Sequence, residues 1–201
     1  MNLPNTLTVS RIILAPLFFL LLWIPEWFSF GMQGFSIAAL VVFLLIEASD
    51  LADGFIARKY DLVTDLGKVM DPFSDVFSRL TYFVSFLSLG IMHPVFTLII
   101  LYREFSIIFV RMILAQRGIA LAAKSGGKLK SVFYFLASVA SLVYLGLIRF
   151  EGSESLLQYS RITVDVLFGV SAFLALTSFL EYLKIFFEKM KETDSSKSSS
   201  T

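Results

Sequence analysis

Apolar residues form six long stretches of the chain, and each stretch is close to the length that an α-helix needs to cross a membrane. The stretches cover residues 8–25, 34–57, 71–91, 94–115, 129–148 and 163–187. A hydrocarbon layer of about 30 Å requires roughly 20 helical residues. Pro25 and Gly31 separate the first two stretches. Gly90 and Pro94 bracket the short link between the third and the fourth. The pattern predicts an all-α integral membrane protein with six transmembrane helices.

The composition agrees with a membrane location and removes several kinds of chemistry. Of the 201 residues, 57% are hydrophobic and only 16% are charged, and the mean hydropathy is +0.79. The absence of cysteine excludes disulfides, thiolate catalysis and cysteine-bound metal. The net charge of +1 gives no sign of a nucleic-acid partner, and we expect none. No small-residue cleavage site follows the first apolar stretch, so we expect the first helix to remain.

Basic residues gather in alternate connections, which predicts how the helices are oriented. Lysine and arginine cluster at residues 58–68, at residues 116–130 and after residue 183. Because short cytoplasmic loops carry an excess of these residues, we expect both termini and the 58–68 connection to face the cytoplasm. Residues 191–201 are polar and rich in serine, which predicts a disordered tail after a single membrane domain, 1–190.

Four aspartates lie at the cytoplasmic ends of the second and third stretches. Asp50 and Asp53 are three residues apart, and Asp71 and Asp75 are four apart, so each helix presents its pair on one face. An ionised carboxylate in or near a bilayer is destabilising unless it is paired or liganded. A divalent metal shared by the two helices would provide that compensation.

The residues around the aspartates indicate a phosphorylated substrate. Oxygen ligands without nearby histidine or cysteine favour Mg²⁺ or Mn²⁺, and Mg²⁺ commonly completes its shell with water and substrate phosphates. Gly54 and Ala57 would let a ligand approach the backbone closely, and Arg58 offers a planar donor fork suited to phosphate. Isolated aspartates more often cap helices or face water, which is our interpretation of Asp61 and Asp65.

A cation transporter is the competing class, because transporters also place carboxylates among apolar helices. All four acids fall within residues 50–75, and no second acidic site lies toward the far side of the membrane. This distribution favours an enzyme, and metal-dependent release of a nucleotide product would separate the two classes.

The motif Asp50-x-x-Asp53-Gly54-x-x-Ala57-Arg58, then eight residues, then Gly67-x-x-x-Asp71-x-x-x-Asp75, resembles the complete signature of the CDP-alcohol phosphatidyltransferases. The resemblance implies a CDP-alcohol phosphotransferase fold of six membrane helices, a CDP-linked lipid donor and two bound metal ions. It implies that the metal ligands are Asp50, Asp53, Asp71 and Asp75. It also implies that Asp75 is the general base, and the outermost aspartate would have most room to face an acceptor.

Further motifs resemble the branch of this family whose acceptor is sn-glycerol 3-phosphate. They are Asn2-Leu3-Pro4-Asn5-x-Leu7-Thr8-x-x-Arg11, Arg103-Glu104 with Arg111, and Gly127-Lys128-x-Lys130. The resemblance implies that CDP-diacylglycerol is the donor and CMP the leaving group. We assign CDP binding to Asn5, Thr8, Gly54, Ala57, Arg58 and Gly67. We assign the acceptor phosphate to Arg103, Arg111, Lys128 and Lys130.

The chain departs from this branch at two positions. Val76 stands where the branch usually has lysine, and Ser131 stands where it usually has threonine. We hypothesise that Arg79, four residues after Asp75, supplies the missing cation. Inositol phosphate, serine or choline are the alternative acceptors. The resemblance also implies a homodimer among membrane lipids, in a bacterial inner membrane.

Overall fold

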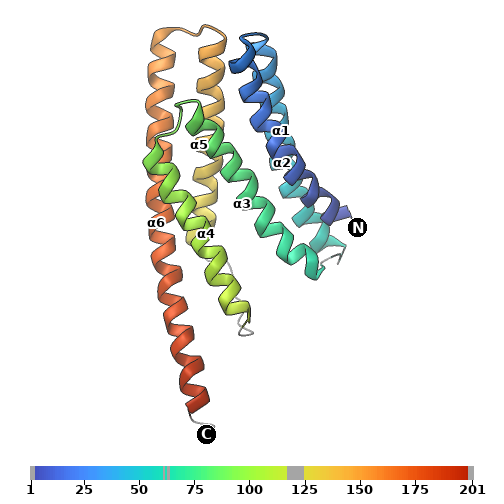
Figure 1. The fold of residues 1–201 in the computed structure, drawn as a ribbon, viewed down its shortest axis with the longest axis vertical. Coiled ribbons are helices and arrows are strands. Elements are labelled where there is room, and N and C mark those ends of the chain that lie inside the picture. Colours follow the sequence, from blue (N-terminus) through green and yellow to red (C-terminus); the bar gives the residue numbers. More distant parts are fainter. Residues whose placement is uncertain (1–2, 61, 63, 117–124, 199–201) are drawn as a thin grey trace. The chain divides into compact units, whose positions relative to one another are not determined.

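The computed structural model describes residues 3–60, 62, 64–116 and 125–198, and six α-helices make up most of them (Figure 1). The helices are α1 (Leu3–Phe28), α2 (Met32–Lys59), α3 (Asp65–Ser88), α4 (Pro94–Gln116), α5 (Ser125–Arg149) and α6 (Glu154–Ser198). Each predicted apolar stretch overlaps one helix, so the all-α prediction is confirmed. α6 is far longer than the predicted span, at 45 residues. α6 continues to Ser198 and residues 199–201 lie outside the described part, so a disordered tail at 191–201 stays a prediction.

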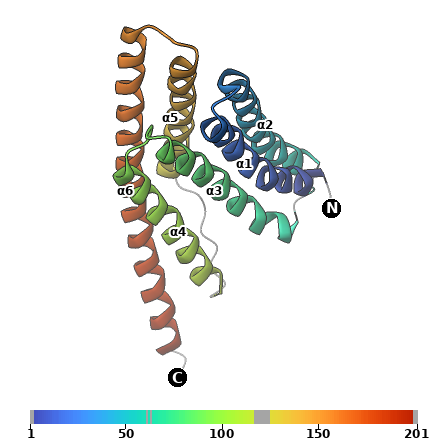
Figure 2. The same cartoon turned by 45° about the horizontal axis from the view of Figure 1, so that its top comes forward.

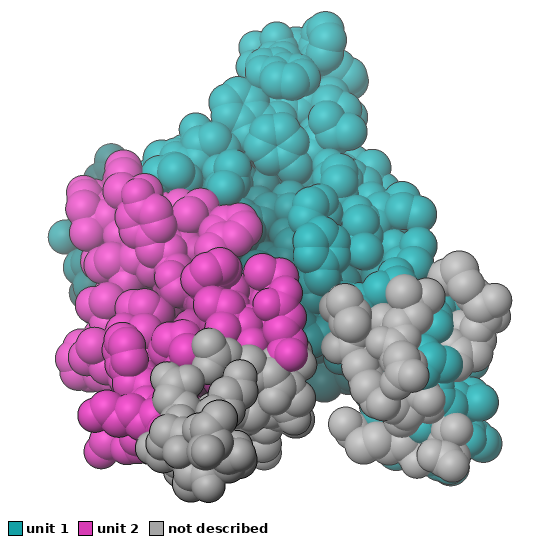
Figure 3. All heavy atoms as spheres, turned by 60° about the horizontal axis from the view of Figure 1, so that its bottom comes forward, with its two compact units in different colours: residues 1–92, 138–164 teal, residues 93–137, 165–201 magenta. Residues whose placement is uncertain are grey.

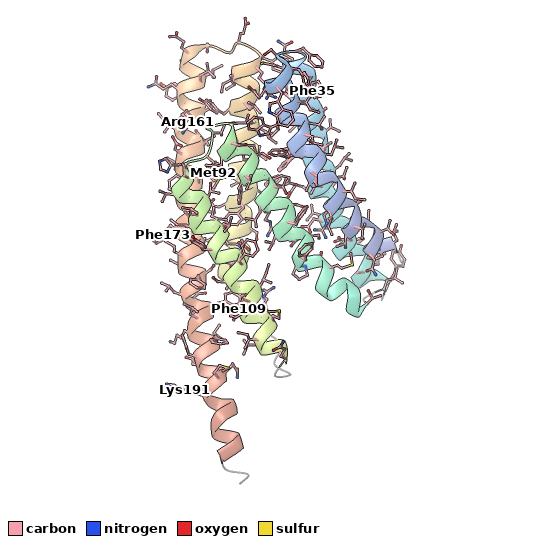
Figure 4. The ribbon with its side chains drawn as sticks, viewed as in Figure 1. Phe35, Met92, Phe109, Arg161, Phe173 and Lys191 are labelled. Atoms are coloured by element: carbon pink, nitrogen blue, oxygen red, sulfur yellow. The ribbon has the colours of Figure 1, made fainter. Side chains whose placement is uncertain are left out.

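Four of the described helices are long and apolar enough to cross a membrane on their own. These segments are Leu3–Phe28, Met32–Ala57, Leu129–Arg149 and Glu154–Lys191. α3 contains several charged residues, and α4, although apolar over most of its length, carries the three charged residues Arg103, Glu104 and Arg111. Large apolar side chains such as Phe109 and Phe173 are more than half exposed (Figure 4), which suits a surface that faces lipid. The protein is an integral membrane protein, while the crossing of α3 and α4 stays a prediction.

The chain divides into two compact units, each described here by itself (Figure 3). Unit 1 comprises Met1–Met92 and Ser138–Val164, and unit 2 comprises His93–Ala137 and Asp165–Thr201. The divisions fall within α5 and α6, so both of these helices contribute to both units. The acidic motif lies entirely in unit 1.

In unit 1, α1 packs against both α2 and α3 (Figures 1 and 2). A buried aromatic cluster joins the three helices: the Tyr82 ring of α3 lies 4.9 Å from Phe18 of α1 and 5.1 Å from Phe43 of α2. All three side chains are at most 1% exposed. This packing holds α1 and the two helices that carry the acidic motif, α2 and α3, at fixed positions relative to one another.

Polar contacts tie the rest of unit 1 to these helices. The buried Arg149 of α5 donates to the Leu22 carbonyl (2.9 Å) and to Glu26 (2.8 Å) on α1. Arg161 of α6 donates to the Gly90 carbonyl at 3.0 Å, in the turn that ends at Met92 (Figure 4). Gly90 has a φ of +69°, a left-handed conformation that glycine adopts without steric penalty. The turn after α3 therefore has both a local and a long-range restraint.

Candidate active site

Four aspartates from two helices meet in unit 1, as their spacing predicts. Asp50 and Asp53 lie in the second half of α2, and Asp71 and Asp75 lie in the first half of α3. One carboxylate oxygen from each of Asp50, Asp53 and Asp71 lies within 4.8 Å of the others. Asp75 shares a common partner with all three, the guanidinium of Arg11 on α1. Packing of α1 against both α2 and α3 thus brings the two separate sequence motifs together in one acidic cluster.

Arg11 lies among the four carboxylates and is 1% exposed. Its Nη1 donates to Asp50 and Asp75, and its Nη2 donates to Asp53 and Asp71 at 2.6 Å each. The Thr8 hydroxyl, one turn earlier on α1, donates to Asp53 Oδ2 at 3.1 Å. α1 therefore supplies hydrogen-bond donors to a set of acids on two other helices.

The four carboxylates differ in their access to solvent. The side chain of Asp71 is 51% exposed, and those of Asp50 and Asp75 are 32% and 27% exposed. Asp53 is nearly covered, at 5%. The sequence argument expected Asp75 to be outermost, but Asp71 is the more exposed because it lies a turn nearer the start of α3. The role of Asp75 as general base stays a prediction.

A pocket of about 190 Å³ opens beside the cluster in unit 1. Its lining residues are Pro4, Asn5, Thr8, Asp53, Gly54, Ala57, Leu62, Thr64, Gly67 and Asp71. Five of the six residues assigned to CDP binding are among them: Asn5, Thr8, Gly54, Ala57 and Gly67. The side chain of the sixth, Arg58, lies outside the described residues. The structure thus gathers most of the predicted nucleotide site around one pocket, with two metal-ligand candidates in its wall.

Hydrogen bonds fix the wall of this pocket where α3 begins. The side chain of Thr64 caps α3 by accepting from the Gly67 amide at 3.0 Å. The Asn5 amide donates to the same hydroxyl at 3.2 Å, which links α1 to the start of α3. A Cβ at position 67 would lie 2.9 Å from Asn5 Oδ1 and 3.0 Å from Thr64 Oγ1. Only glycine allows this close approach without displacing the Asn5 side chain.

Arg79 lies one helical turn after Asp75 and faces the same acid. Its Nη2 is 3.8 Å from Asp75 Oδ2, and its side chain is 24% exposed. This long ion pair agrees with the hypothesis that Arg79 replaces the cation that is missing at Val76, which stays a hypothesis.

Two of the predicted acceptor residues, Arg103 and Lys130, lie in a buried polar cluster of unit 2. Arg103 donates to both oxygens of Glu104 at 3.1 Å and to the Ser178 hydroxyl at 3.0 Å. Lys130 donates to the same Glu104 carboxylate and lies 4.7 Å from the centre of the Tyr134 ring. Arg103, Glu104 and Lys130 are each at most 6% exposed. One buried carboxylate is therefore shared by two of the proposed phosphate ligands.

Arg111 is more exposed than Arg103 and Lys130, the other two predicted acceptor residues whose side chains are described. It lies two turns after Arg103 on α4, is partly exposed, and donates to the Tyr182 hydroxyl at 3.2 Å. Its guanidinium carbon lies 5.8 Å from the centre of the Tyr182 ring. The side chain of Lys128 lies outside the described residues. Arg111 is therefore the described cation best suited to accept a new anionic partner.

A model of the CDP-alcohol phosphatidyltransferase family matches residues 1–177. The chain belongs to this family. A relative from Treponema pallidum is 35% identical over 95% of this chain and 92% of its own length. A relative from Aquifex aeolicus is 32% identical over 90% and 94%, and one from Bacillus subtilis is 31% identical over 71% and 77%. All three are named CDP-diacylglycerol–glycerol-3-phosphate 3-phosphatidyltransferase.

The acidic cluster fits the divalent metal that this family uses. Its carboxylate oxygens are hard ligands drawn from two helices, and their spacing allows three of them to reach one ion. The cluster also already holds one positive group, the guanidinium of Arg11. Both features indicate a site that is built for positive charge.

Reasoning from the sequence missed several residues that shape these sites. Arg11 was recognised only as part of a motif, although a lone arginine in an apolar helix signals a buried anionic partner. Thr64 carried the signal of a helix cap, since it precedes the charged start of α3. Ser178 and Tyr182 carried no usable signal, because their pairing with α4 is a tertiary contact between residues more than 70 positions apart.

Proposed function

We propose that this protein transfers the phosphatidyl group of CDP-diacylglycerol to sn-glycerol 3-phosphate, which gives phosphatidylglycerophosphate and CMP for phospholipid biosynthesis. The observation that carries the proposal is the four-aspartate cluster of a CDP-alcohol phosphatidyltransferase beside a pocket lined by the signature residues. The acceptor is inferred from the relatives' names, which agree over most of each chain. We assign catalysis to residues 1–190.

In the proposed reaction, a hydroxyl oxygen of the acceptor attacks the lipid-bearing phosphorus of the donor. The new P–O bond replaces the bond to CMP, and the hydroxyl proton passes to Asp75. Asp50, Asp53, Asp71 and Asp75 would hold two ions of Mg²⁺ or Mn²⁺. When bound, these ions stabilise the negative charge on the attacking and leaving oxygens. Asn5, Thr8, Gly54, Ala57, Arg58 and Gly67 would bind the cytidine diphosphate.

Cations of unit 2 would bind the acceptor phosphate. Arg111 would make the principal contact, since it is partly exposed and its described partner is a neutral tyrosine hydroxyl. Arg103 and Lys130 share Glu104, so we expect them chiefly to set the local charge and geometry, with Lys128 as a further ligand. An anionic acceptor is favoured over choline or serine by this concentration of basic groups.

We also propose the cellular setting. The enzyme would lie in the bacterial inner membrane as a homodimer, with the acidic cluster facing the cytoplasm. The basic connections at residues 58–68 and 116–130 support this orientation. Both soluble components of the reaction, glycerol 3-phosphate and CMP, would then enter and leave on the cytoplasmic side.

The test is CMP release by the purified protein with CDP-diacylglycerol and competing acceptors. We expect release to require a divalent metal, and glycerol 3-phosphate to be used in preference to glycerol, inositol phosphate, serine and choline. Preference for another alcohol would contradict the acceptor assignment alone. Failure to release CMP with any acceptor, together with metal-dependent ion flux in vesicles, would instead indicate the transporter class.

Arg111→Gln tests the acceptor site separately from the donor site. Loss of one charge-assisted phosphate contact should lower kcat/KM for glycerol 3-phosphate by roughly ten- to hundredfold, with little change in the KM for CDP-diacylglycerol. Arg161→Gln is the control. It makes the same substitution at an arginine that donates to the Gly90 carbonyl in the turn after α3 and is not assigned to the acceptor site. A raised donor KM with normal use of the acceptor would refute the assignment of Arg111.

A further inference from the structure

Arg11 makes one hydrogen bond to each of the four aspartates of the acidic cluster. The two terminal nitrogens of a guanidinium carry four N–H groups, and the four contacts of Arg11 go to four different carboxylates. Nη1 joins Asp50 of α2 to Asp75 of α3, and Nη2 joins Asp53 of α2 to Asp71 of α3. Each terminal nitrogen therefore bridges the same two helices that a shared metal ion would bridge.

The charge of Arg11 is permanent. Four ionised carboxylates in one partly buried cluster repel one another, and burial strengthens that repulsion. Lysine or histidine could lose its proton in such a place, whereas arginine keeps its charge at any physiological pH. The cluster thus contains a fixed cation, supplied by α1, that bonds to the same carboxylates that are suited to metal coordination.

We propose that Arg11 is an internal counterion of the metal site. It holds the four carboxylates together before metal binds, and it gives up part of its N–H contacts when divalent ions take the same oxygens. This inference rests on the proposed metal site and adds a positioning residue to it. Arg11 does not line the pocket, so we assign it no direct contact with the substrate.

A purely structural brace is the other interpretation of a buried arginine, and Arg149 provides the comparison. Its side chain is 2% exposed and pairs with the Glu26 carboxylate in the same unit, remote from the acidic motif in sequence. The contribution of a brace to stability should be the same with and without metal. The contribution of a counterion should be largest without metal, because divalent ions neutralise the same carboxylates.

The experiment is thermal unfolding of the full-length protein in detergent, in EDTA and in saturating Mg²⁺. Arg11→Gln should lower the unfolding midpoint in EDTA by roughly 6–20 °C, the range expected when one partner of a buried ionic cluster is removed. Mg²⁺ should recover much of that loss, so the Mg²⁺-induced rise should be larger in Arg11→Gln than in the native protein. Arg149→Gln should lose as much stability in Mg²⁺ as in EDTA.

The outcomes separate this inference from the proposed function. A Mg²⁺-induced rise that is equal in Arg11→Gln and in the native protein would overturn the counterion role and leave the metal site intact. The absence of any Mg²⁺-induced rise in all three proteins would overturn the metal site and the counterion role together. The metal site and the counterion role are both supported if Mg²⁺ raises the unfolding midpoint of the native protein and raises that of Arg11→Gln, but not that of Arg149→Gln, by a larger amount.

A double variant keeps the test decisive if Arg11→Gln does not fold. Asp50→Asn removes one of the four charges that Arg11 balances. If repulsion between uncompensated carboxylates causes the defect, Arg11→Gln/Asp50→Asn should fold in EDTA or unfold at a higher temperature than Arg11→Gln. A double variant that is no more stable than the single one would refute the counterion role.

Discussion

The exposure of Asp71 makes it the most informative single position in the acidic cluster. Its carboxylate is half exposed, contacts Arg11 and lines the pocket, so a change there alters ligand chemistry without opening a buried core. Asp53 has the opposite character, because its side chain is almost fully covered and also bonds to Thr8. Substitution of Asp53 would combine effects on stability with effects on the metal.

Asp71→Asn should leave the protein folded in detergent and lower turnover by about 100-fold or more. The amide keeps the shape of the side chain but removes an anionic ligand, and loss of even an indirect metal partner typically reduces activity 10- to 100-fold. The measurements are CMP release and the elution profile of the purified variant. Near-normal turnover at saturating Mg²⁺ would contradict the assignment of Asp71 as a ligand.

Gly67→Ala should weaken donor binding through Asn5. The added Cβ would lie 2.9 Å from Asn5 Oδ1, so the Asn5 side chain must move within the pocket wall. Disturbing one hydrogen-bonding group should raise the apparent KM for CDP-diacylglycerol by roughly 2- to 10-fold. Gly34→Ala is the matched control, because nothing lies within 4 Å of a Cβ at that position. Equal effects of the two substitutions would indicate a general change in the helices.

Among the helices, the sequence predicted what depends on periodicity and could not predict what depends on packing. The apolar stretches identified all six helices, and the aspartate spacing identified the faces of α2 and α3 that meet. The contacts of Arg11 with those faces depend on how α1 packs, which no local pattern encodes. In the same way, Arg103 and Lys130 were recognised as cations, but their shared partner Glu104 follows only from the tertiary structure.

α4 is joined to its neighbours in unit 2 by a buried charge network, which makes Glu104 a structural residue. Glu104→Gln would replace a carboxylate that accepts from both Arg103 and Lys130 by a neutral amide. Removing one partner from a buried ionic cluster typically lowers stability by about 3–5 kcal/mol, so the unfolding midpoint in detergent should fall markedly. Glu181→Gln is the control, because Glu181 is exposed on α6. Equal midpoints for the two variants would contradict this role.

At the scale of the whole molecule, the number of membrane spans depends on whether α3 and α4 cross the bilayer. The other four helices have the length and composition of membrane spans, whereas α3 carries Asp71 and Asp75 and α4 carries Arg103, Glu104 and Arg111. If α3 and α4 cross as a pair, the connection around His93 lies outside. If neither crosses, His93 stays on the cytoplasmic side, and the sidedness of every other connection is unchanged.

Single cysteines can decide between these topologies, because the native chain contains none. Tyr60→Cys should react only from the cytoplasmic side, and Phe30→Cys and Ser153→Cys only from outside; all three positions are exposed. His93→Cys, also exposed, is the deciding variant. We expect a membrane-impermeant maleimide added to intact cells to label His93→Cys as fully as Ser153→Cys, since a six-span protein brings both connections to the outer face.

Protection of His93→Cys together with labelling of Ser153→Cys would leave four spans and refute the crossing of α3 and α4. Labelling of Tyr60→Cys from outside would reverse the whole orientation and would place the acidic cluster away from its soluble substrates.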